Sequence, residues 1–372
     1  MQLNLESISK KVGPQTWLYD MTLAPRSGAV TVLLGATQAG KTSLMRIMAG
    51  LDVPTAGTVR VDGVDVTGMP VRERNVAMVY QQFINYPSLK VRDNIASPLR
   101  LMKVSASEID RQVRETADMM KLTPMLGRKP LELSGGQQQR CALARALVKG
   151  AGLVLLDEPL ANLDYKLREE LRVEIPKIFE ASGAIFVYAT TEPEEALLLG
   201  GNTAALWEGR ITQFGPTAEV YRRPADRRTA RVFSDPPMNF AAVEKRGGQL
   251  DFGAGVHAPA TGISAGLADG RYIAGFRANH LSLAGQQDGQ VAEFACRLGG
   301  TEITGAETYL HLTRGEGFAM TDESESAWVG LIHGVHDLPR GAEVRIAVDP
   351  SFVYLFTEAG ALAAPASYAM AG

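Results

Sequence analysis

A glycine-bearing loop between the apolar run at residues 30–34 and a helical pattern that stops at Gly50 constrains the fold more than any other stretch. The loop fits the pattern GxxxxGK(S/T), in which loop amides and a helix N-terminus point at phosphate oxygens. The lysine of such a loop reaches the terminal phosphates, and the next hydroxyl binds Mg²⁺. The alternative is a glycine turn beside a solvated lysine. The residues are Gly35, Ala36, Thr37, Gln38, Ala39, Gly40, Lys41, Thr42 and Ser43.

Other short apolar runs favour a parallel sheet flanked by helices, because they alternate with longer helical patterns. Residues 76–80, 153–156 and 185–189 are expected strands, and a helical stretch over 91–120 is expected to break at Pro98. After about Ala230 the helical periodicity ends. Four short β-prone segments between glycines then predict a small barrel or sandwich: residues 272–277, 309–313, 344–348 and 352–356.

Two adjacent carboxylates, Asp157 and Glu158, follow the apolar run at 153–156. Acids near a helix N-terminus are one explanation, since the helix dipole attracts them. The functional explanation assigns Asp157 to the Mg²⁺ shell and Glu158 to polarising an attacking water, as phosphoryl transfer requires. The phosphate loop precedes this pair at the spacing of a second βα unit, which favours the functional explanation.

The string LSGGQ at residues 133–137 is the most specific in the chain. Ser134 can cap a helix, and Gln137 can complete a capping box. Two successive glycines, Gly135 and Gly136, are costly for capping alone, and they suit a backbone that closely approaches an anion.

LSGGQ before LVLLDEP, with the phosphate loop upstream, resembles the ATP-binding cassette ATPases over essentially the whole chain. The resemblance implies an enzyme that binds ATP and Mg²⁺ and hydrolyses ATP. It implies an α/β P-loop NTPase cassette at residues 1–232 with a helical subdomain at about 88–150. An all-β OB-like regulatory domain at 233–360 would follow. The composition of the end of the chain, which is short and alanine-rich, separately predicts a flexible tail at 361–372.

The same resemblance assigns roles to individual residues. The signature residues Ser134, Gly135, Gly136 and Gln137 would complete the ATP site of an opposite subunit. Gln81 would contact Mg²⁺ and the attacking water, and Asp164 would lie at the dimer seam. The implied metal-binding residues are Thr42, Gln81 and Asp157, and the implied catalytic positions are Glu158, Gln81 and Thr191.

The segment from residue 81 to 95 is similar to importer ATPases of the maltose and glycerol-phosphate type. Phe83, Ile84 and Tyr86 would then receive a helix of a membrane subunit, the alternative being ordinary core packing. Strings at 224–225, 236–239, 275–280 and 349–356 resemble the domain junction and regulatory domain of that subfamily, the alternative being generic β turns. The implied partners are two integral-membrane permease subunits and, indirectly, a solute-binding protein.

Three departures from the family pattern concern one nucleotide site. Thr191 occupies the position of the switch histidine, and Gln38 that of a glycine. The adenine-stacking aromatic aligns near Val12, with Trp17 and Tyr19 close enough to substitute. These departures suggest that the chain is the weaker-site member of an ATPase heterodimer with a paralogous subunit.

Composition narrows the remaining function classes. The net charge of −3 argues against nucleic-acid binding. The two cysteines, Cys141 and Cys296, are far apart and favour a reducing compartment, and no apolar run is long enough to cross a bilayer. We therefore expect a peripheral protein on the cytoplasmic face of the membrane, serving an importer of a carbohydrate or polyol, glycerol being favoured. The alternatives are a homodimeric ATPase of a sulfate, iron or polyamine importer and a non-catalytic nucleotide-sensing regulator.

Overall fold

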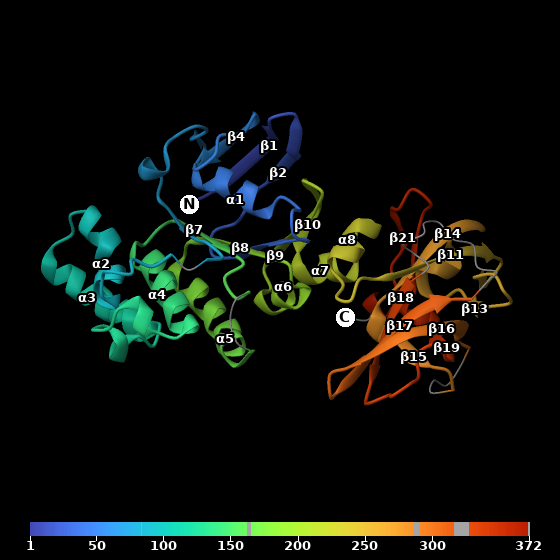
Figure 1. Ribbon diagram of the computed structural model, residues 1–372. Coiled ribbons are helices and arrows are strands. Elements are labelled where there is room, and N and C mark those ends of the chain that lie inside the picture. The colour runs from blue at the N-terminus through green and yellow to red at the C-terminus, as the bar shows by residue number, and fades with distance from the viewer. Residues whose placement is uncertain (83, 162–164, 286–289, 316–326, 371–372) are drawn as a thin grey trace. The chain divides into compact units, whose positions relative to one another are not determined.

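Two units with different secondary structure make up the chain, Met1–Thr217 and Ala218–Gly372. They are seen in a computed structural model that describes all residues except 83, 162–164, 286–289, 316–326 and 371–372 (Figure 1). The division lies before the expected boundary at residues 232 and 233. The reason is that the segment ahead of that boundary bonds to the second unit, as in the backbone hydrogen bond from Arg227 to Gly360 at 2.9 Å.

The first unit is built on a six-stranded sheet of order β10-β9-β3-β8-β7-β6, in which all neighbours except β9 and β10 are parallel. Every residue of β3, β7 and β8 is buried, which explains why these strands are continuous apolar runs. The strands are β3 (Val30–Leu34), β6 (Val76–Val79), β7 (Leu153–Asp157), β8 (Ile185–Thr190), β9 (Asn202–Trp207) and β10 (Arg210–Pro216). The four apolar runs singled out in the sequence are therefore confirmed as strands.

A second, antiparallel sheet of order β2-β1-β4-β5 lies at the N-terminus. Leu5 and Val59 of this sheet share a core with Leu33 of β3 and with Leu44 of helix α1. The sheet therefore packs with the helix that begins at Lys41. Its strands are β1 (Leu3–Val12), β2 (Gln15–Leu23), β4 (Ala56–Val61) and β5 (Val64–Asp65).

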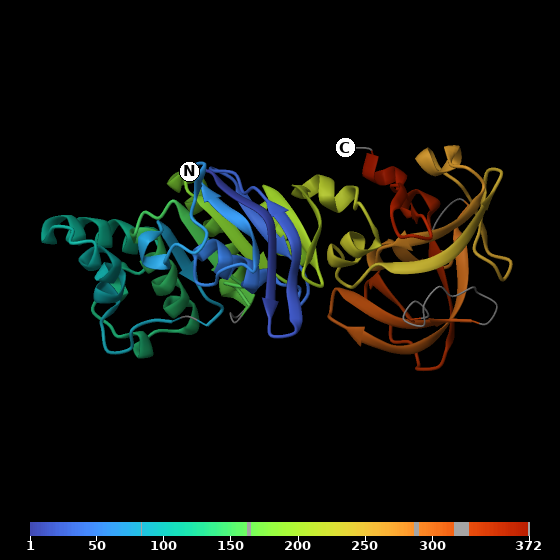
Figure 2. The ribbon, with the colours of Figure 1, turned by 90° about the horizontal axis from the view of Figure 1, so that it is seen from above.

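The helices of the first unit include α2, α3 and α4, which gather on one side of it, away from the N-terminal strands (Figures 1 and 2). The expected break at Pro98 is wrong, because Pro98 lies inside α2. The break comes after α2, where Lys103 has a left-handed φ of 58° and Ser105 caps α3. The helices are α1 (Lys41–Ala49), α2 (Val91–Leu101), α3 (Ala106–Met119), α4 (Gly135–Val148), α5 (Tyr165–Ser182) and α6 (Pro193–Leu199).

The second unit is formed by two antiparallel sheets of order β13-β12-β11-β14-β20-β21 and β15-β19-β16-β17-β18, an OB-like all-β arrangement. Side chains of both sheets form one core, to which Phe276, Phe294 and Trp328 contribute packed rings. Two short helices, α7 (Thr217–Arg222) and α8 (Arg227–Val232), precede the sheets. The strands are β11 (Asn239–Arg246), β12 (Gln249–Asp251), β13 (His257–Pro259), β14 (Gly270–Phe276), β15 (Leu281–Leu283), β16 (Ala292–Ile303), β17 (Glu307–Arg314), β18 (Ala327–His333), β19 (Glu343–Val348), β20 (Tyr354–Phe356) and β21 (Leu362–Ala364).

Two C-terminal strings noted in the sequence brace this unit. Asn239 makes two side-chain hydrogen bonds of 2.9 Å to the backbone of Val329 on the other sheet. The buried Arg277 donates to the hydroxyls of Tyr354 at 2.9 Å and Tyr368 at 2.6 Å, and to the backbone oxygen of Tyr221 at 2.8 Å.

The expectation of a flexible tail over residues 361–372 is wrong for its described part. Strand β21 pairs with β20, and Ala364, Ala366 and Ala369 are buried. Alanine is small enough to pack closely against the aromatic cluster around Phe356. An alanine-rich composition is therefore compatible with an ordered end.

Candidate nucleotide site

The phosphate loop joins β3 to α1 and leaves the N-terminus of that helix without a side-chain cap. Gly40 stands at the cap position with a φ of 104°, and no side chain accepts a hydrogen bond from the first turn of α1. Lys41 is 4% exposed, and its Nζ donates to the backbone oxygens of Gly35 at 2.7 Å and Ala36 at 3.1 Å. Uncapped amides and a held cation in one loop form a site suited to an anion.

Two glycines of this loop are required by their surroundings. A Cβ on Gly35 would come 2.6 Å from the backbone oxygen of Leu206, and one on Gly40 would come 2.7 Å from Leu18. Gln38, in contrast, has a left-handed φ of 68° although it carries a side chain. That conformation costs a non-glycine residue roughly 1–2 kcal/mol. The sequence departure at position 38 thus coincides with backbone strain.

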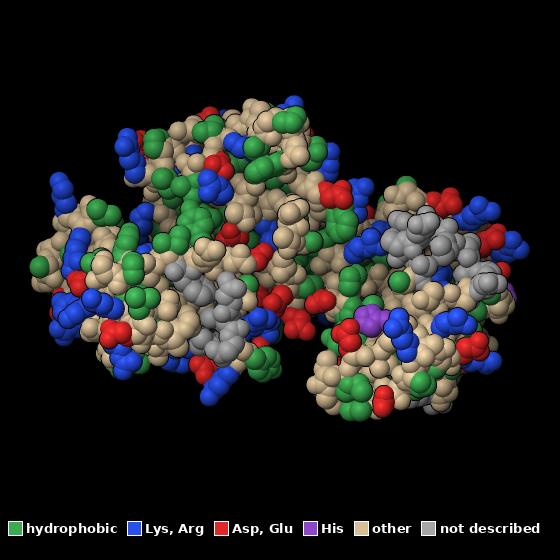
Figure 3. Space-filling view, in the orientation of Figure 1, with side chains coloured by type: hydrophobic (Ala, Val, Ile, Leu, Met, Phe, Trp, Pro, Cys, Tyr) green, Lys and Arg blue, Asp and Glu red, His purple; other side chains and the backbone are tan. Residues whose placement is uncertain are grey.

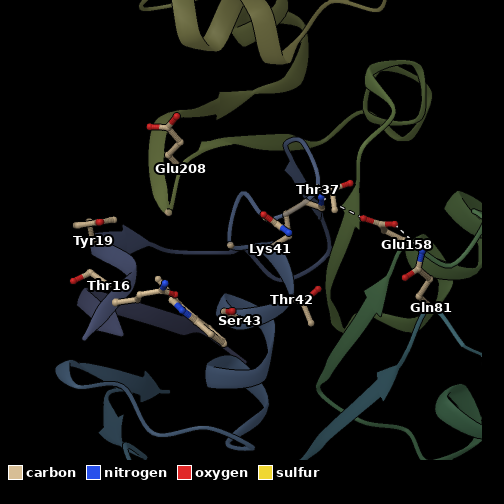
Figure 4. A pocket seen from close by; sticks show the side chains of 14 residues that line it. Thr16, Tyr19, Thr37, Lys41, Thr42, Ser43, Gln81, Glu158 and Glu208 are labelled. Atoms are coloured by element: carbon tan, nitrogen blue, oxygen red, sulfur yellow. Dashed lines mark hydrogen bonds and ion pairs between the residues drawn. The ribbon is translucent and has the colours of Figure 1, made fainter. Parts of the chain in front are cut away.

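The acidic pair at the end of β7 lies directly against the loop, and its second member, Glu158, points toward Gln81 in Figure 4. Thr42 Oγ1 donates to Asp157 Oδ1 at 3.2 Å, and Lys41 Nζ lies 3.3 Å from Glu158 Oε1. Gln81 Nε2 donates to Glu158 Oε2 at 3.0 Å. The structure therefore brings together five residues that the sequence had singled out from three separate segments.

Burial perturbs two charges of this group in opposite directions. Desolvation lowers the pKa of Lys41, and the Glu158 carboxylate opposes this shift. Desolvation also raises the pKa of Asp157, which the hydrogen bond from Thr42 opposes. A ligand anion beside Lys41 and a cation beside Asp157 would each stabilise the charged form of its neighbour.

The residues of this site fit Mg²⁺ better than they fit a metal ion coordinated by protein side chains alone. In the described part of the chain, no group of three or more His, Cys, Asp or Glu side chains could hold a metal ion. Thr42, Gln81 and Asp157 offer oxygen donors of the kind that Mg²⁺ accepts alongside water and substrate phosphates.

A cavity of about 770 Å³ opens beside these residues, large enough for a nucleotide. Trp17 and Tyr19 line it, whereas Val12 does not, so an aromatic side chain is present although it comes from β2. The Arg210 guanidinium lies 4.2 Å over the Tyr19 ring. The lining consists of Gln15, Thr16, Trp17, Tyr19, Thr37, Gln38, Gly40, Lys41, Thr42, Ser43, Gln81, Glu158, Glu208 and Gly209.

The turn at Glu208 and Gly209 is part of this wall and was missed by the sequence reasoning. Gly209 donates its amide to Ala39 O at 3.1 Å and accepts from the Tyr19 amide at 2.8 Å. A Cβ on Gly209 would come 2.3 Å from Trp17 O. A two-residue Glu-Gly turn between strands was the only available signal, and it does not reveal which loop it contacts.

The switch position lies close to the loop without lining the cavity. Thr191 is exposed at the end of β8. Its neighbour Thr190 accepts a hydrogen bond from the Gly35 amide at 3.3 Å. Position 191 is therefore fixed near the first residue of the phosphate loop.

The LSGGQ segment does not line the cavity. Ser134 caps α4 and forms the expected capping box, since Ser134 Oγ accepts from the Gln137 amide and Gln137 Oε1 from the Ser134 amide. A Cβ on the exposed Gly135 would meet open space, so packing within this chain does not require a glycine there. Gly135, the first residue of α4, is thus exposed beside the capping Ser134.

Two of the expected contact residues lie outside the described residues, namely Phe83 and Asp164. Ile84 is 55% exposed and Tyr86 46% exposed. The alternative that Ile84 and Tyr86 pack in the core is therefore wrong. The Arg145 guanidinium lies 4.9 Å from the centre of the Tyr86 ring, which holds this exposed ring in place.

Both cysteines are free and buried, and no helix of the described residues has the length and apolarity that a membrane span needs.

Comparison with known proteins agrees with the geometry. Residues 18–161 match the family described as ABC transporter. The chain is 34% identical over 352 residues to the sn-glycerol-3-phosphate import ATP-binding protein UgpC of Paracoccus denitrificans, covering 95% of this chain and 96% of that protein. It is 40% identical over 258 residues to the trehalose/maltose import ATP-binding protein MalK of Thermococcus litoralis, covering 68% and 69%.

A solved structure is also similar. The ATP-binding cassette MJ0796, described as a dimer in a post-hydrolysis state bound to ADP and Pi, matches with a TM-score of 0.52 at 28% identity. The match covers 58% of this chain and 98% of that one.

Proposed function

Because the chain belongs to the ABC transporter family of import ATP-binding proteins, we propose that it binds ATP in the cavity beside Lys41 and that hydrolysis there energises an importer. The observation that carries this proposal is the meeting of Lys41, Thr42, Gln81, Asp157 and Glu158 at one end of the sheet. A loop for phosphates, oxygen donors for Mg²⁺ and a carboxylate for water are the parts that phosphoryl transfer needs.

In the proposed mechanism, the loop amides and Lys41 hold the phosphates, with Lys41 Nζ exchanging Glu158 for a terminal phosphate oxygen. Thr42, Gln81 and Asp157 would hold Mg²⁺, which neutralises phosphate charge when bound. Glu158, released from Lys41 and kept near Gln81, polarises the attacking water. Trp17 stacks on the adenine in place of the aromatic residue absent from position 12.

A second subunit completes the site in this proposal. Ser134, Gly135, Gly136 and Gln137 lie outside the cavity at the start of α4, where Gly135 is exposed, and they would contact the ATP of an opposite cassette. Asp164 would lie at the seam between the two subunits. The dimeric state described for MJ0796 supports a paired arrangement.

We also propose that this chain contributes the weaker site of a pair with a paralogous ATPase subunit. Two departures support this, the strained Gln38 and the switch position Thr191, whose side chain can neither become a cation nor reach as far as histidine. The third departure does not, because Trp17 lines the cavity. Under this proposal Thr191→His should raise the rate of hydrolysis by up to about 10²–10³-fold, the usual value of one preorganised contact. An unchanged rate would contradict the weaker-site proposal and favour a homodimer.

The transported solute is proposed as a carbohydrate or small polyol, with glycerol favoured. Full-length relatives named for sn-glycerol-3-phosphate and α-glucoside transport support the class, whereas a spermidine/putrescine import relative supports the alternative of a polyamine importer. Two permease subunits would dock at the exposed Ile84 and Tyr86, with a solute-binding protein acting beyond them, and the chain would lie on the cytoplasmic face of the membrane.

Uptake by cells of the source organism tests this function. Deletion of the chain should abolish ATP-dependent uptake of labelled glycerol or sugar, wild type should restore it, and Glu158→Gln should not. Restoration by Glu158→Gln would show that uptake does not need hydrolysis at this chain's own site, which contradicts an essential catalytic role and leaves a weaker site paired with a stronger one or a non-catalytic nucleotide-sensing subunit. Selective loss of spermidine, sulfate or iron uptake would redirect the solute assignment.

A further inference from the structure

The residue that follows the switch position is held by two arginines of another element. Glu192 Oε1 accepts from Arg168 at 2.8 Å, and Glu192 Oε2 accepts from Arg172 at 2.9 Å. Both arginines belong to α5. Arg172 is 11% and Arg168 25% exposed, so water screens these pairs less than surface pairs.

Glu194, two residues further along, provides a contrast. It is 79% exposed and lies 4.0 Å from Arg172, and acidic side chains gather over α6 in the space-filling view (Figure 3). A pair at that distance and exposure contributes little. Glu192 and Glu194 are therefore close in sequence, but only Glu192 is hydrogen-bonded to the two arginines.

The segment that Glu192 anchors also bonds to both halves of the nucleotide site. At the end of β8, Thr190 O accepts from the Gly35 amide at 3.3 Å and Ala189 O accepts from the Glu158 amide at 2.9 Å. Thr190 Oγ1 accepts from the Glu192 amide at 3.0 Å and donates to the buried Glu195 at 2.6 Å. If this segment shifted, it would therefore displace Gly35 of the phosphate loop and Glu158 of the acidic pair, or break its hydrogen bonds to them.

Helix α5 cannot follow such a shift freely. Leu171 and Ile175 of α5 are buried. The helix begins at Tyr165, immediately after the segment that contains Asp164. The Glu192 clamp, defined as Glu192 with Arg168 and Arg172, thus joins the switch segment to the helix that follows the proposed dimer seam.

We propose that Glu192 is a positioning residue, which through Arg168 and Arg172 holds the end of β8, and with it Gly35 and Glu158, in place relative to the nucleotide. This inference rests on the proposed function of the cavity. The amides of Gly35 and Glu158 bond to this segment, so the places of both residues beside a ligand depend on where its backbone is held. Misplacement by about 1 Å can cost about 10²-fold in rate.

The test compares Glu192→Gln, Glu192→Asp and the matched control Glu194→Gln in the full-length chain. Single-turnover hydrolysis of ATP with Mg²⁺ should be about 10–100-fold slower in Glu192→Gln, with ATP affinity changed less than about threefold. Glu192→Asp keeps the charge and should recover most of the rate. Glu194→Gln should match wild type.

A second readout is independent of activity. Hydrogen exchange of the amides at 190–199 should rise in Glu192→Gln and not in Glu194→Gln, with exchange in β3 unchanged. If Glu192→Gln does not fold, Arg168→Gln, which removes one of the two bonds, takes its place.

Wild-type rate and wild-type exchange in Glu192→Gln would overturn the inference. Equal slowing in Glu192→Gln and Glu194→Gln would also overturn it. Absence of Glu158-dependent hydrolysis in wild type would instead refute the proposed function, and the exchange measurement would still decide the role of the clamp.

Discussion

Replacing Gln38 by glycine should stabilise the first unit and strengthen ATP binding at once. Gln38 adopts a φ of 68° at the edge of the cavity. Glycine reaches this conformation without steric cost, and its Cα leaves the loop amides open to phosphate.

The magnitude follows from two opposing terms. Relief of the left-handed conformation gives roughly 1–2 kcal/mol, and the larger backbone entropy of unfolded glycine takes back about 0.5–1 kcal/mol. The net gain of about 0.5–1 kcal/mol should raise the unfolding midpoint of the first unit by about 1–4 °C. One improved charge-assisted hydrogen bond to phosphate would tighten ATP binding by up to about tenfold.

Thermal unfolding and isothermal titration with ATP measure both effects, and Lys103→Gly is the matched control. Lys103 is exposed, has a φ of 58° and does not line the cavity. It should give a similar rise in midpoint with unchanged ATP affinity. The reasoning is refuted if Gln38→Gly fails to stabilise the fold, or if it binds ATP no better than Lys103→Gly does.

Trp17→Ala should weaken ATP binding about tenfold or more, since base stacking on an aromatic ring contributes about 1–3 kcal/mol, whereas Tyr86→Ala, with equal exposure, should not. Burial lowers the pKa of His280 to about 3, so as the pH falls this imidazole is protonated in the unfolded chain before it is protonated in the folded chain. Between about pH 6 and pH 3 the free energy of unfolding of the second unit should fall by up to about 1.4 kcal/mol per pH unit, and His280→Phe should flatten the slope in pH-dependent denaturant titrations. Burial raises the pKa values of Cys141 and Cys296 to about 11, so a thiol reagent at pH 8 should label them only as fast as the chain unfolds.

The phosphate loop and the acidic pair could be placed from sequence because each requires particular residues at a strand end. Lys41 and Asp157 follow buried apolar strands, and parallel strands bring their carboxyl ends to one edge of the sheet. The aromatic position could not be placed. Val12 and Trp17 lie on the adjacent strands β1 and β2, and which of them lines the cavity depends on register shifts within β1, which a pattern does not reveal.

The ordered C-terminal end was missed for another physical reason. Alanine has little burial energy of its own, so composition predicted disorder at residues 361–372. Pairing with β20 and close packing on neighbouring aromatic rings supply the order instead. Such tertiary contacts leave no periodic signal in a three-residue strand like β21.

Single-turnover hydrolysis of ATP by the full-length chain with Mg²⁺ tests the central claim most directly. The proposed site predicts slow, measurable release of phosphate by wild type. It predicts loss of release in Glu158→Gln with ATP binding retained, and loss of both binding and release in Lys41→Ala. Glu115→Gln, an exposed carboxylate change on α3, should behave as wild type. Hydrolysis by Glu158→Gln at the wild-type rate would contradict the assignment of this cavity as the catalytic site.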